Sequence, residues 1–174
     1  MANLFSADKV AATLTNVKLS NGLVISEIAL EVDEFSLASG SFKPHSPKTG
    51  RVVATLTEPH IAEFLDTTLP SAVKKVDVQL VGGRIQVAAL AKVVFDIKAL
   101  ALMHIEIVDG KQLHVILEDA DPFPARGLIE SQIENANPIF DAADLPFAVT
   151  IERTEIEAGQ LRAFGTFILD AAGE

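Results

Sequence analysis

The chain has 174 residues, a formal net charge of −10, ten Phe, and no Cys, Trp or Tyr. This length fits a single domain over residues 1–174 with one core, and the absence of Cys excludes disulfides, thiolate metal sites and thiol nucleophiles. The negative charge argues against binding to nucleic acid or to strongly anionic membranes, because both require concentrated Lys and Arg.

Apolar residues make up 49% of the chain and the mean hydropathy is +0.33, yet no stretch approaches the length of a membrane-spanning helix. The apolar excess must therefore lie inside the protein. Met1 to Ser6 shows neither the basic leader nor the hydrophobic segment of a signal peptide. We expect a cytoplasmic protein for the sequence as written, and an envelope protein if a leader has been removed.

The first part of the chain predicts a β-hairpin. Val10 to Leu19 has the pattern of a strand, and Asn21-Gly22 predicts the turn that follows it. In the return strand the apolar positions change parity twice, near Ser26 and Glu34. A β-bulge at each change would bend the strand while keeping one face inward.

The segment from Ala38 to Gly50 is rich in Ser, Gly and Pro and predicts a loop. It contains Lys43 and Lys48 but no acid, so it is locally positive beside Phe42. One interpretation is a solvated loop. The other is that Phe42, Lys43 and Lys48 contact a phosphate headgroup or an acidic partner.

Two amphipathic helices are predicted, and each has an apolar face that would pack on a sheet. The first begins at its N-cap Thr57 and ends at Pro70. The second runs from about Ala125 to Asn137 and stops at Pro138. The apolar faces comprise Ile61, Phe64, Leu65 and Leu69 in the first helix, and Leu128, Ile129, Ile133 and Ala136 in the second.

Apolar side chains alternate with mixed ones from Ile85 to Ile107, and no Gly, Pro or Asn interrupts this run. A straight strand of this length would reach ~80 Å, whereas a compact domain of this size is about 40 Å across. The run therefore either curls strongly or consists of two strands joined by a bulge or bend. Its Ala residues are where we place the bending.

After this run, Asp109-Gly110 predicts a hairpin turn. If Gly110 takes the left-handed position of a three-residue turn, Ile105 faces Leu113 and Met103 faces Val115, and the same register sets His104 opposite His114. Further strands are predicted over 51–56, 75–81, 147–151 and 160–169. Together these patterns predict an α+β fold in which a strongly curved, mainly antiparallel sheet with long bent strands packs on two amphipathic helices.

Candidate catalytic clusters are sparse. His60 and Glu63 have helical spacing, but the second His of a metalloprotease helix is missing. His104, His114 and Glu106 could share a cation across two strands, or could simply lie on a solvated sheet face. No Ser lies in a nucleophile elbow. We therefore expect no enzymatic activity, no metal and no cofactor.

The apolar excess has two interpretations that composition does not separate. The two helices could close a tightly filled core, or they could leave an apolar groove for an acyl chain between themselves and the concave sheet. In the second case the lining residues would be Phe64, Leu65, Phe95, Ile97, Leu128 and Ile133.

Several motifs between Arg51 and Leu169 occur in a recognisable order. They are Leu56-Thr57-Glu58 before the first helix, Val76-Asp77-Val78 with Gly83-Arg84-Ile85-Gln86-Val87, the Asp109-Gly110 turn with Leu113 to Leu117, and Leu145-Pro146 with Val149, Ile151, Gly159-Gln160-Leu161 and Gly165. In these motifs the chain resembles the bacterial LmeA-type phospholipid-binding family, and the hairpin from Val10 to Leu37 would be a family-like start.

The resemblance implies a curved sheet around helices, similar to tubular lipid-binding folds, and a lipid or other amphiphile as partner near a membrane. It brings no catalytic residue, because the motifs contain none. The alternative is an interaction protein with a filled core that offers a sheet edge, or the loop from Ala38 to Gly50, to a protein partner. Neither interpretation predicts the oligomeric state.

Overall fold

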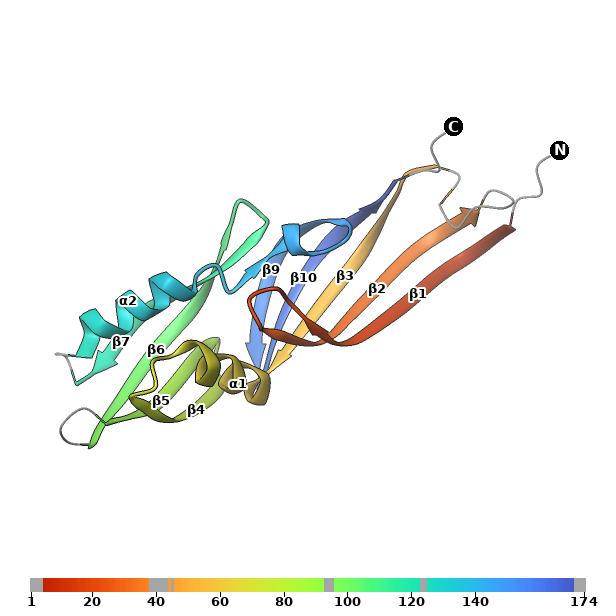
Figure 1. Cartoon of the computed structure of the whole chain (residues 1–174). Coiled ribbons are helices and arrows are strands. Elements are labelled where there is room, and N and C mark those ends of the chain that lie inside the picture. The colour runs from red at the N-terminus through yellow and green to blue at the C-terminus, as the bar shows by residue number, and fades with distance from the viewer. Residues whose placement is uncertain (1–4, 38–43, 45, 93–95, 123–124, 171–174) are drawn as a thin grey trace.

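The protein is described by a computed structural model that covers residues 5–37, 44, 46–92, 96–122 and 125–170. Its strands form two five-stranded antiparallel sheets that follow one another along an elongated molecule (Figure 1). The first sheet has the order β1-β2-β3-β10-β9 and the second the order β4-β5-β6-β7-β8. The strands of the first sheet are β1 Phe5–Lys18, β2 Val24–Leu37, β3 Lys48–Thr57, β9 Ala148–Glu157 and β10 Gln160–Leu169. The strands of the second sheet are β4 Val73–Val81, β5 Arg84–Lys92, β6 Asp96–Val108, β7 Gln112–Asp121 and β8 Phe140–Asp141.

The curved antiparallel sheet and the two helices are confirmed, whereas the α+β class is only partly right. Strands make up 66% of the described residues and the strands curl into a half-barrel, while α1 (Glu58–Thr68) and α2 (Arg126–Ala136) have 11 residues each. The sequence patterns also suggested one sheet where there are two. Alternation defines each strand and its inner face, but it does not say which strands pair with one another.

The alternating run from Ile85 to Ile107 forms two strands, which was one of the two predicted possibilities. The predicted bend between the strands is wrong, because the chain reverses its direction there. β5 and β6 pair antiparallel, with Ala89 opposite Ala99 and Val87 opposite Ala101. The Ala residues that we expected to mark a bend therefore lie inside the paired strands. The connection at 93–95 is outside the described residues, and it lacks the Gly, Pro or Asn that usually identifies a turn.

Both strands of the first hairpin change their inner face at the same two places. The predicted face changes are confirmed, but the predicted bulges are wrong: the β1–β2 pairing runs from Phe5–Leu37 to Lys18–Val24 without a register shift. Instead, Glu34 and Asn16 take positive φ angles of 53° and 52°. Because paired residues share a face, one apolar stripe results. It consists of Phe5, Ala7, Val10, Ala12, Leu14 and Val17 on β1, opposite Leu37, Phe35, Val32, Leu30, Ile28 and Ile25 on β2.

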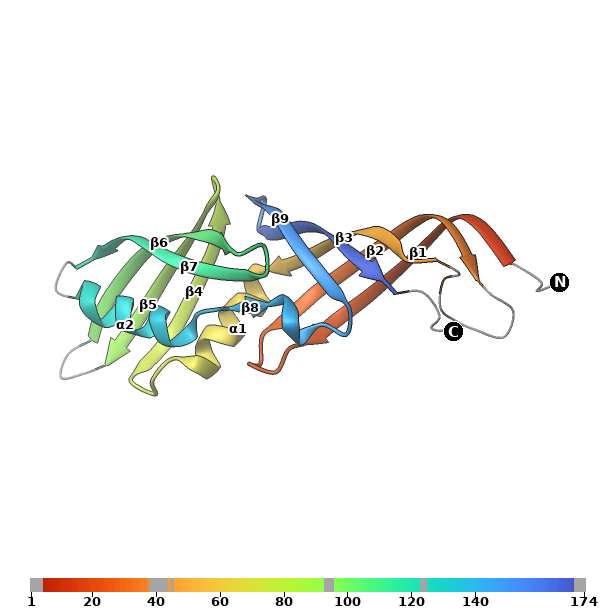
Figure 2. The same cartoon turned by 90° about the horizontal axis from the view of Figure 1, so that it is seen from above.

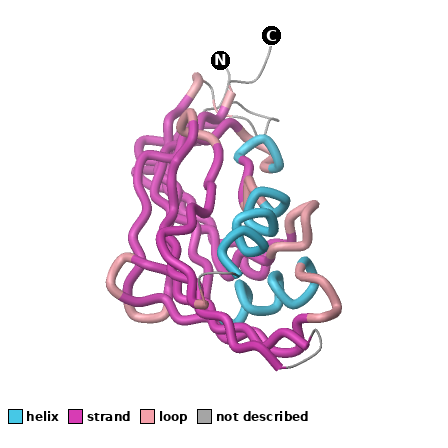
Figure 3. Tube along the Cα trace, turned by 90° about the vertical axis from the view of Figure 1, so that its left-hand side faces the viewer, coloured by secondary structure: helices cyan, strands magenta, loops and turns pink. Residues whose placement is uncertain are grey.

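The two helices lie on the same side of the strands (Figures 2 and 3). α1 packs mainly against β4, and α2 packs against β7. The helix positions agree with the sequence, although Thr57 makes no side-chain cap. Its hydroxyl lies 3.2 Å from His60 Nδ1 instead, and Ser26 Oγ lies 2.7 Å from the same nitrogen. His60 thereby attaches α1 to the first sheet.

The buried apolar side chains form one cluster that includes residues of both sheets. Leu23, Ile25, Ile28, Leu56, Leu113 and Leu161 are its most deeply buried large side chains. Within the described part of the chain, no polar or charged residue is buried. The cluster is therefore stabilised by apolar burial and packing without an internal polar network.

Candidate functional site

The six side chains proposed to line a groove occupy different environments. Phe64 is buried in the core, while Leu65 and Ile133 are half-buried and pack against it. Ile97 and Leu128 are 41% and 64% exposed. Phe95 lies outside the described residues. The assignment of these side chains to a lipid site stays a prediction.

Ile97 and Leu128 lie toward the same end of the second sheet. Ile97 is the second residue of β6, directly after the β5–β6 connection. Leu128 is in the first turn of α2, which follows the end of β7. Asp121, the last residue of β7, pairs with Leu100 of β6, so this end of β7 lies near the start of β6. Both exposed apolar side chains are therefore found toward the outer end of the second sheet.

The residues proposed for headgroup contact are not brought to that end. Lys48 begins β3, opposite Leu169 at the end of β10, at the outer end of the first sheet (Figure 1). Phe42 and Lys43 lie outside the described residues. Lys48 and Ile97 are therefore at opposite ends of the molecule, and one lipid headgroup at Lys48 cannot have its acyl chain at Ile97.

Arg51, which follows the predicted loop, is paired with acids. Its guanidinium contacts Glu31 at 3.3 Å and Asp33 at 3.1 Å. Lys9 also contacts Glu31, at 2.7 Å. Hydrogen bonds from Lys9 and then Arg51 lower the pKa of the Glu31 carboxyl below its usual value. The sequence around Arg51 contains no acid, and only strand pairing reveals these partners.

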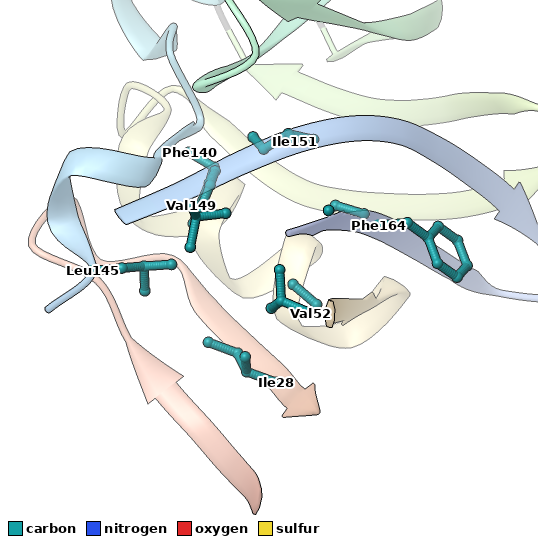
Figure 4. Close-up of a pocket in the computed structure, with 10 residues that line it drawn as sticks. Ile28, Val52, Phe140, Leu145, Val149, Ile151 and Phe164 are labelled. Carbon is teal, nitrogen blue, oxygen red and sulfur yellow. The ribbon is translucent and has the colours of Figure 1, made fainter. Parts of the chain in front are cut away.

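A small apolar cavity lies under the concave face of the first sheet. It has a volume of about 20 Å³, and its lining comes from the inner faces of β2, β3, β9 and β10 together with Phe140 and Leu145 (Figure 4). Ile28, Val52, Val149 and Leu145 surround a common space, while the Phe164 ring points away from it. This volume holds about one water molecule, whereas small-molecule sites usually measure about 300–1,000 Å³. An acyl chain would require its cover to move.

That cover is the segment from Phe140 to Leu145, which follows α2 and has no helix or strand pattern in the sequence. Asp141 fixes it: Oδ1 accepts from Ala143 N at 2.8 Å, and Oδ2 accepts from Gln112 Nε2 at 2.7 Å. The hydrogen bond from the Ala143 backbone lowers the pKa of the Asp141 carboxyl most, and the hydrogen bond from the Gln112 side chain lowers it further. Alternation predicted the sheet side of the cavity through Val149 and Ile151. Nothing in the spacing of Phe140 and Leu145 indicated that they close it.

A larger, more polar hollow of about 350 Å³ lies where the two sheets meet. Its lining comes from the β4–β5 turn, β6 and β9, and includes His104, Glu155 and Glu157. Two backbone hydrogen bonds join the sheets here, from Gly83 N to Ile156 O and from Gly159 N to Leu80 O, both at 3.2 Å. The hollow therefore belongs to the junction, and its lining is mixed, with Ile105 and Ile156 beside His104, Glu155 and Glu157.

The predicted pairing of His104 with His114 is wrong. His104 lies opposite Ile116, and His114 lies opposite Glu106. The β6–β7 turn occupies residues 109–111, one position later than we assumed. From Met103 onward, each residue of β6 therefore pairs with a β7 residue two positions further along the chain than predicted. The predicted pairings of Ile105 with Leu113 and of Met103 with Val115 are wrong for the same reason. His104 Nδ1 is instead 3.1 Å from Glu118 Oε1.

The described residues contain neither a metal-binding cluster nor a membrane-spanning helix. No group of three or more His, Cys, Asp or Glu side chains in this part of the protein is placed to hold a metal ion. Neither α1 nor α2 has the length and apolar character needed to span a bilayer.

The structure thus has two antiparallel sheets whose apolar inner residues share one core, and two helices cover part of them. A family model described as LmeA-like phospholipid-binding matches residues 6–166. The chain therefore belongs to the LmeA-like phospholipid-binding family, which confirms the resemblance and extends it through the first hairpin. The family description names binding and no reaction. No match was found among the curated proteins or among the solved structures.

Proposed function

We propose that this protein binds a phospholipid without catalysing a reaction, and that an acyl chain lies between α2 and the concave face of the second sheet. Membership of a phospholipid-binding family supports the ligand class. The observation that carries the location is that α2 covers β7 without fully burying a single side chain. Little apolar burial would therefore be lost if α2 moved away from the sheet.

The surface under α2 suits an acyl chain in composition. The half-buried Ile129 and Ile133 pack against the core from the helix side. On the sheet side, beyond β7, Ala89 and Ala99 lie opposite each other in the central strands β5 and β6. Small side chains in the centre of a concave face leave space that a larger residue would fill. The proposed ligand would replace helix contacts with contacts to these strands.

The entrance in this proposal is the outer end of the second sheet, where Ile97 and Leu128 are exposed. Exposed apolar side chains at one end of an elongated protein can enter the interfacial region of a bilayer. Contact with a zwitterionic membrane fits the net charge of −10 better than contact with an anionic one. The cytoplasmic location expected from the sequence stays a prediction.

The test is a titration with vesicles of zwitterionic phospholipid that carry a fluorescent acyl chain, using Leu128→Glu and Ile97→Glu variants. Burying a large aliphatic side chain is worth about 1.5–3 kcal/mol, so each variant should weaken lipid binding about tenfold or more. Both side chains are exposed in the free protein, so unfolding should change little.

Val81→Glu is the matched control. Val81 is also exposed, at 53%, but it follows the buried Leu80 and so lies on the opposite face of the second sheet. This variant should bind lipid like the unmodified protein. Equal binding by all three variants would overturn the proposed location. Absence of lipid binding by the unmodified protein would overturn the function and favour the alternative, a partner-binding protein with a filled core.

A further inference from the structure

The outer edge of β1 lacks the features that usually prevent a sheet edge from pairing with another strand. Short length, charged side chains, Pro and bulges are the common protections. β1 has 14 residues, no Gly or Pro, and no charged side chain from Val10 to Val17. Among the described residues, β2 is the only strand paired with it.

The other three sheet edges are protected. β9 carries Glu152, Arg153, Glu155 and Glu157. β4 carries Lys74, Lys75 and Asp77. β8 pairs only with Gln112 and Leu113 of β7; the rest of the β7 edge is hydrogen-bonded at Val115 by Asn137 and carries Glu118, Asp119 and Asp121. The absence of protection is therefore specific to β1 and is not a general property of this fold.

β1 also exposes the apolar stripe that it shares with β2. Phe5, Val10 and Leu14 belong to this stripe and are 64%, 37% and 41% exposed. Val32 and Ile28, the partners of Val10 and Leu14 on β2, are buried, and Leu37, the partner of Phe5, is half-buried. The inner apolar face of the first sheet thus continues to an edge where nothing described covers it. A further strand beside β1 would cover these side chains laterally.

We propose that β1 pairs antiparallel with β1 of a second copy of this chain, around a two-fold axis at Thr13. In this register the uncharged segment from Val10 to Asn16 pairs with its own copy, with Leu14 opposite Ala12 and Thr13 opposite itself. Beyond the face changes at the two ends of this segment, Asp8 of each copy lies opposite Lys18 of the other and Lys9 lies opposite Val17. Neither Asp8 nor Lys18 has an ion-pair partner among the described residues. The two intermolecular ion pairs would flank the uncharged segment on both sides.

The distribution of charge favours a second copy as the occupant. The whole chain has a net charge of −10, whereas β1 contains two lysines and one aspartate. The edge is thus a place where two acidic molecules can approach without facing acid with acid. A register shifted by one residue in either direction would set Leu14, on the inner face, opposite Thr13 or Ala11 on the outer face, which is unfavourable. Pairing would join the two inner faces into one ten-stranded sheet.

Cysteine cross-linking tests the register, because the chain has no Cys of its own. The proposed axis sets the two Thr13 residues directly opposite, with Cα atoms about 4.5–5.5 Å apart, within the range of a disulfide. Two Thr15 residues would be four positions apart along the strands, about 13 Å. Thr13→Cys should therefore form an oxidised dimer, and Thr15→Cys, equally exposed, should not.

Charge reversal tests the same register without oxidation. Asp8→Lys should raise the dimer dissociation constant, measured by sedimentation, about tenfold, and adding Lys18→Asp should restore it. The proposal would be overturned if the protein is a monomer at its highest soluble concentration, or if the two Cys variants cross-link equally. It would also be overturned if the dimer dissociation constant is unchanged by both charge changes, or if a different protein binds this edge in place of a second copy. All measurements are made without added lipid, so their outcome is independent of the proposed function.

Discussion

The side chain of Asn137 pairs with the backbone of Val115 as a neighbouring strand would. Asn137 Nδ2 donates to Val115 O and Val115 N donates to Asn137 Oδ1, both at 2.8 Å. Val115 lies in β7 beyond the two-residue partner β8, so its outer backbone groups would otherwise be unpaired. Asn137 is also the C-cap of α2. One residue thus ends the helix and holds it to the sheet.

Asn137→Ala should loosen α2. It removes two hydrogen bonds, each worth about 0.5–1.5 kcal/mol, so the free energy of unfolding should fall by about 1–3 kcal/mol. Urea denaturation measures the change, and amide exchange should rise in α2 and in β7 near Val115. Asn135→Ala, at an exposed position on the same helix, is the control and should change little. If both variants exchange at the same rate, Asn137 does not hold the helix.

Gly165 should tolerate no side chain. A Cβ at this position would lie 2.1 Å from Thr150 O, a backbone atom of the neighbouring strand. Gly165→Ala should therefore force the strands apart and destabilise the protein by about 1–3 kcal/mol or more. Gly127 in α2 has no atom within 4 Å of such a Cβ, so Gly127→Ala should stabilise the protein by about 0.5–1 kcal/mol. Thermal unfolding that ranks the two variants in the opposite order would contradict this account.

The Asp141 contacts should make part of the stability depend on pH. Because the pKa of Asp141 is lowered in the folded protein, its contribution is complete above the unfolded-state pKa of about 4 and is lost as pH falls through the lower folded-state value. Asp141→Asn should thus be less stable than the unmodified protein at pH 7, with a smaller difference at pH 3. Urea denaturation at both values measures this, and a constant difference would exclude the ionised carboxylate as its source.

Most strands and both helices could be predicted from the sequence because their signals are local. The strand predicted over 160–169 is β10, Gln160–Leu169, and it follows a turn at Ala158-Gly159, where both residues have positive φ angles. The face changes at Ser26 and Glu34 were also readable from parity. What alternation does not encode is strand pairing, so neither the division into two sheets nor the reversal between β5 and β6 could be predicted.

The candidate site was less accessible to prediction. Phe64 was chosen for its helical spacing, but the same spacing is expected of a core residue, which is its environment in the structure. Lys48 was proposed for headgroup contact because it is close to Phe42 and Lys43 in the sequence. Ile97, proposed to line the same lipid site, lies in the other sheet. Phe140 and Leu145, which close the apolar cavity, have no periodic signal. Residues that approach one another only through tertiary packing leave no pattern in one sequence.

Native mass spectrometry of the purified protein tests whether this chain holds a phospholipid. We expect a species heavier than the polypeptide by the mass of one phospholipid, which disappears after extraction with organic solvent and returns after incubation with phospholipid vesicles. A protein that has only the mass of its polypeptide before and after incubation would contradict it.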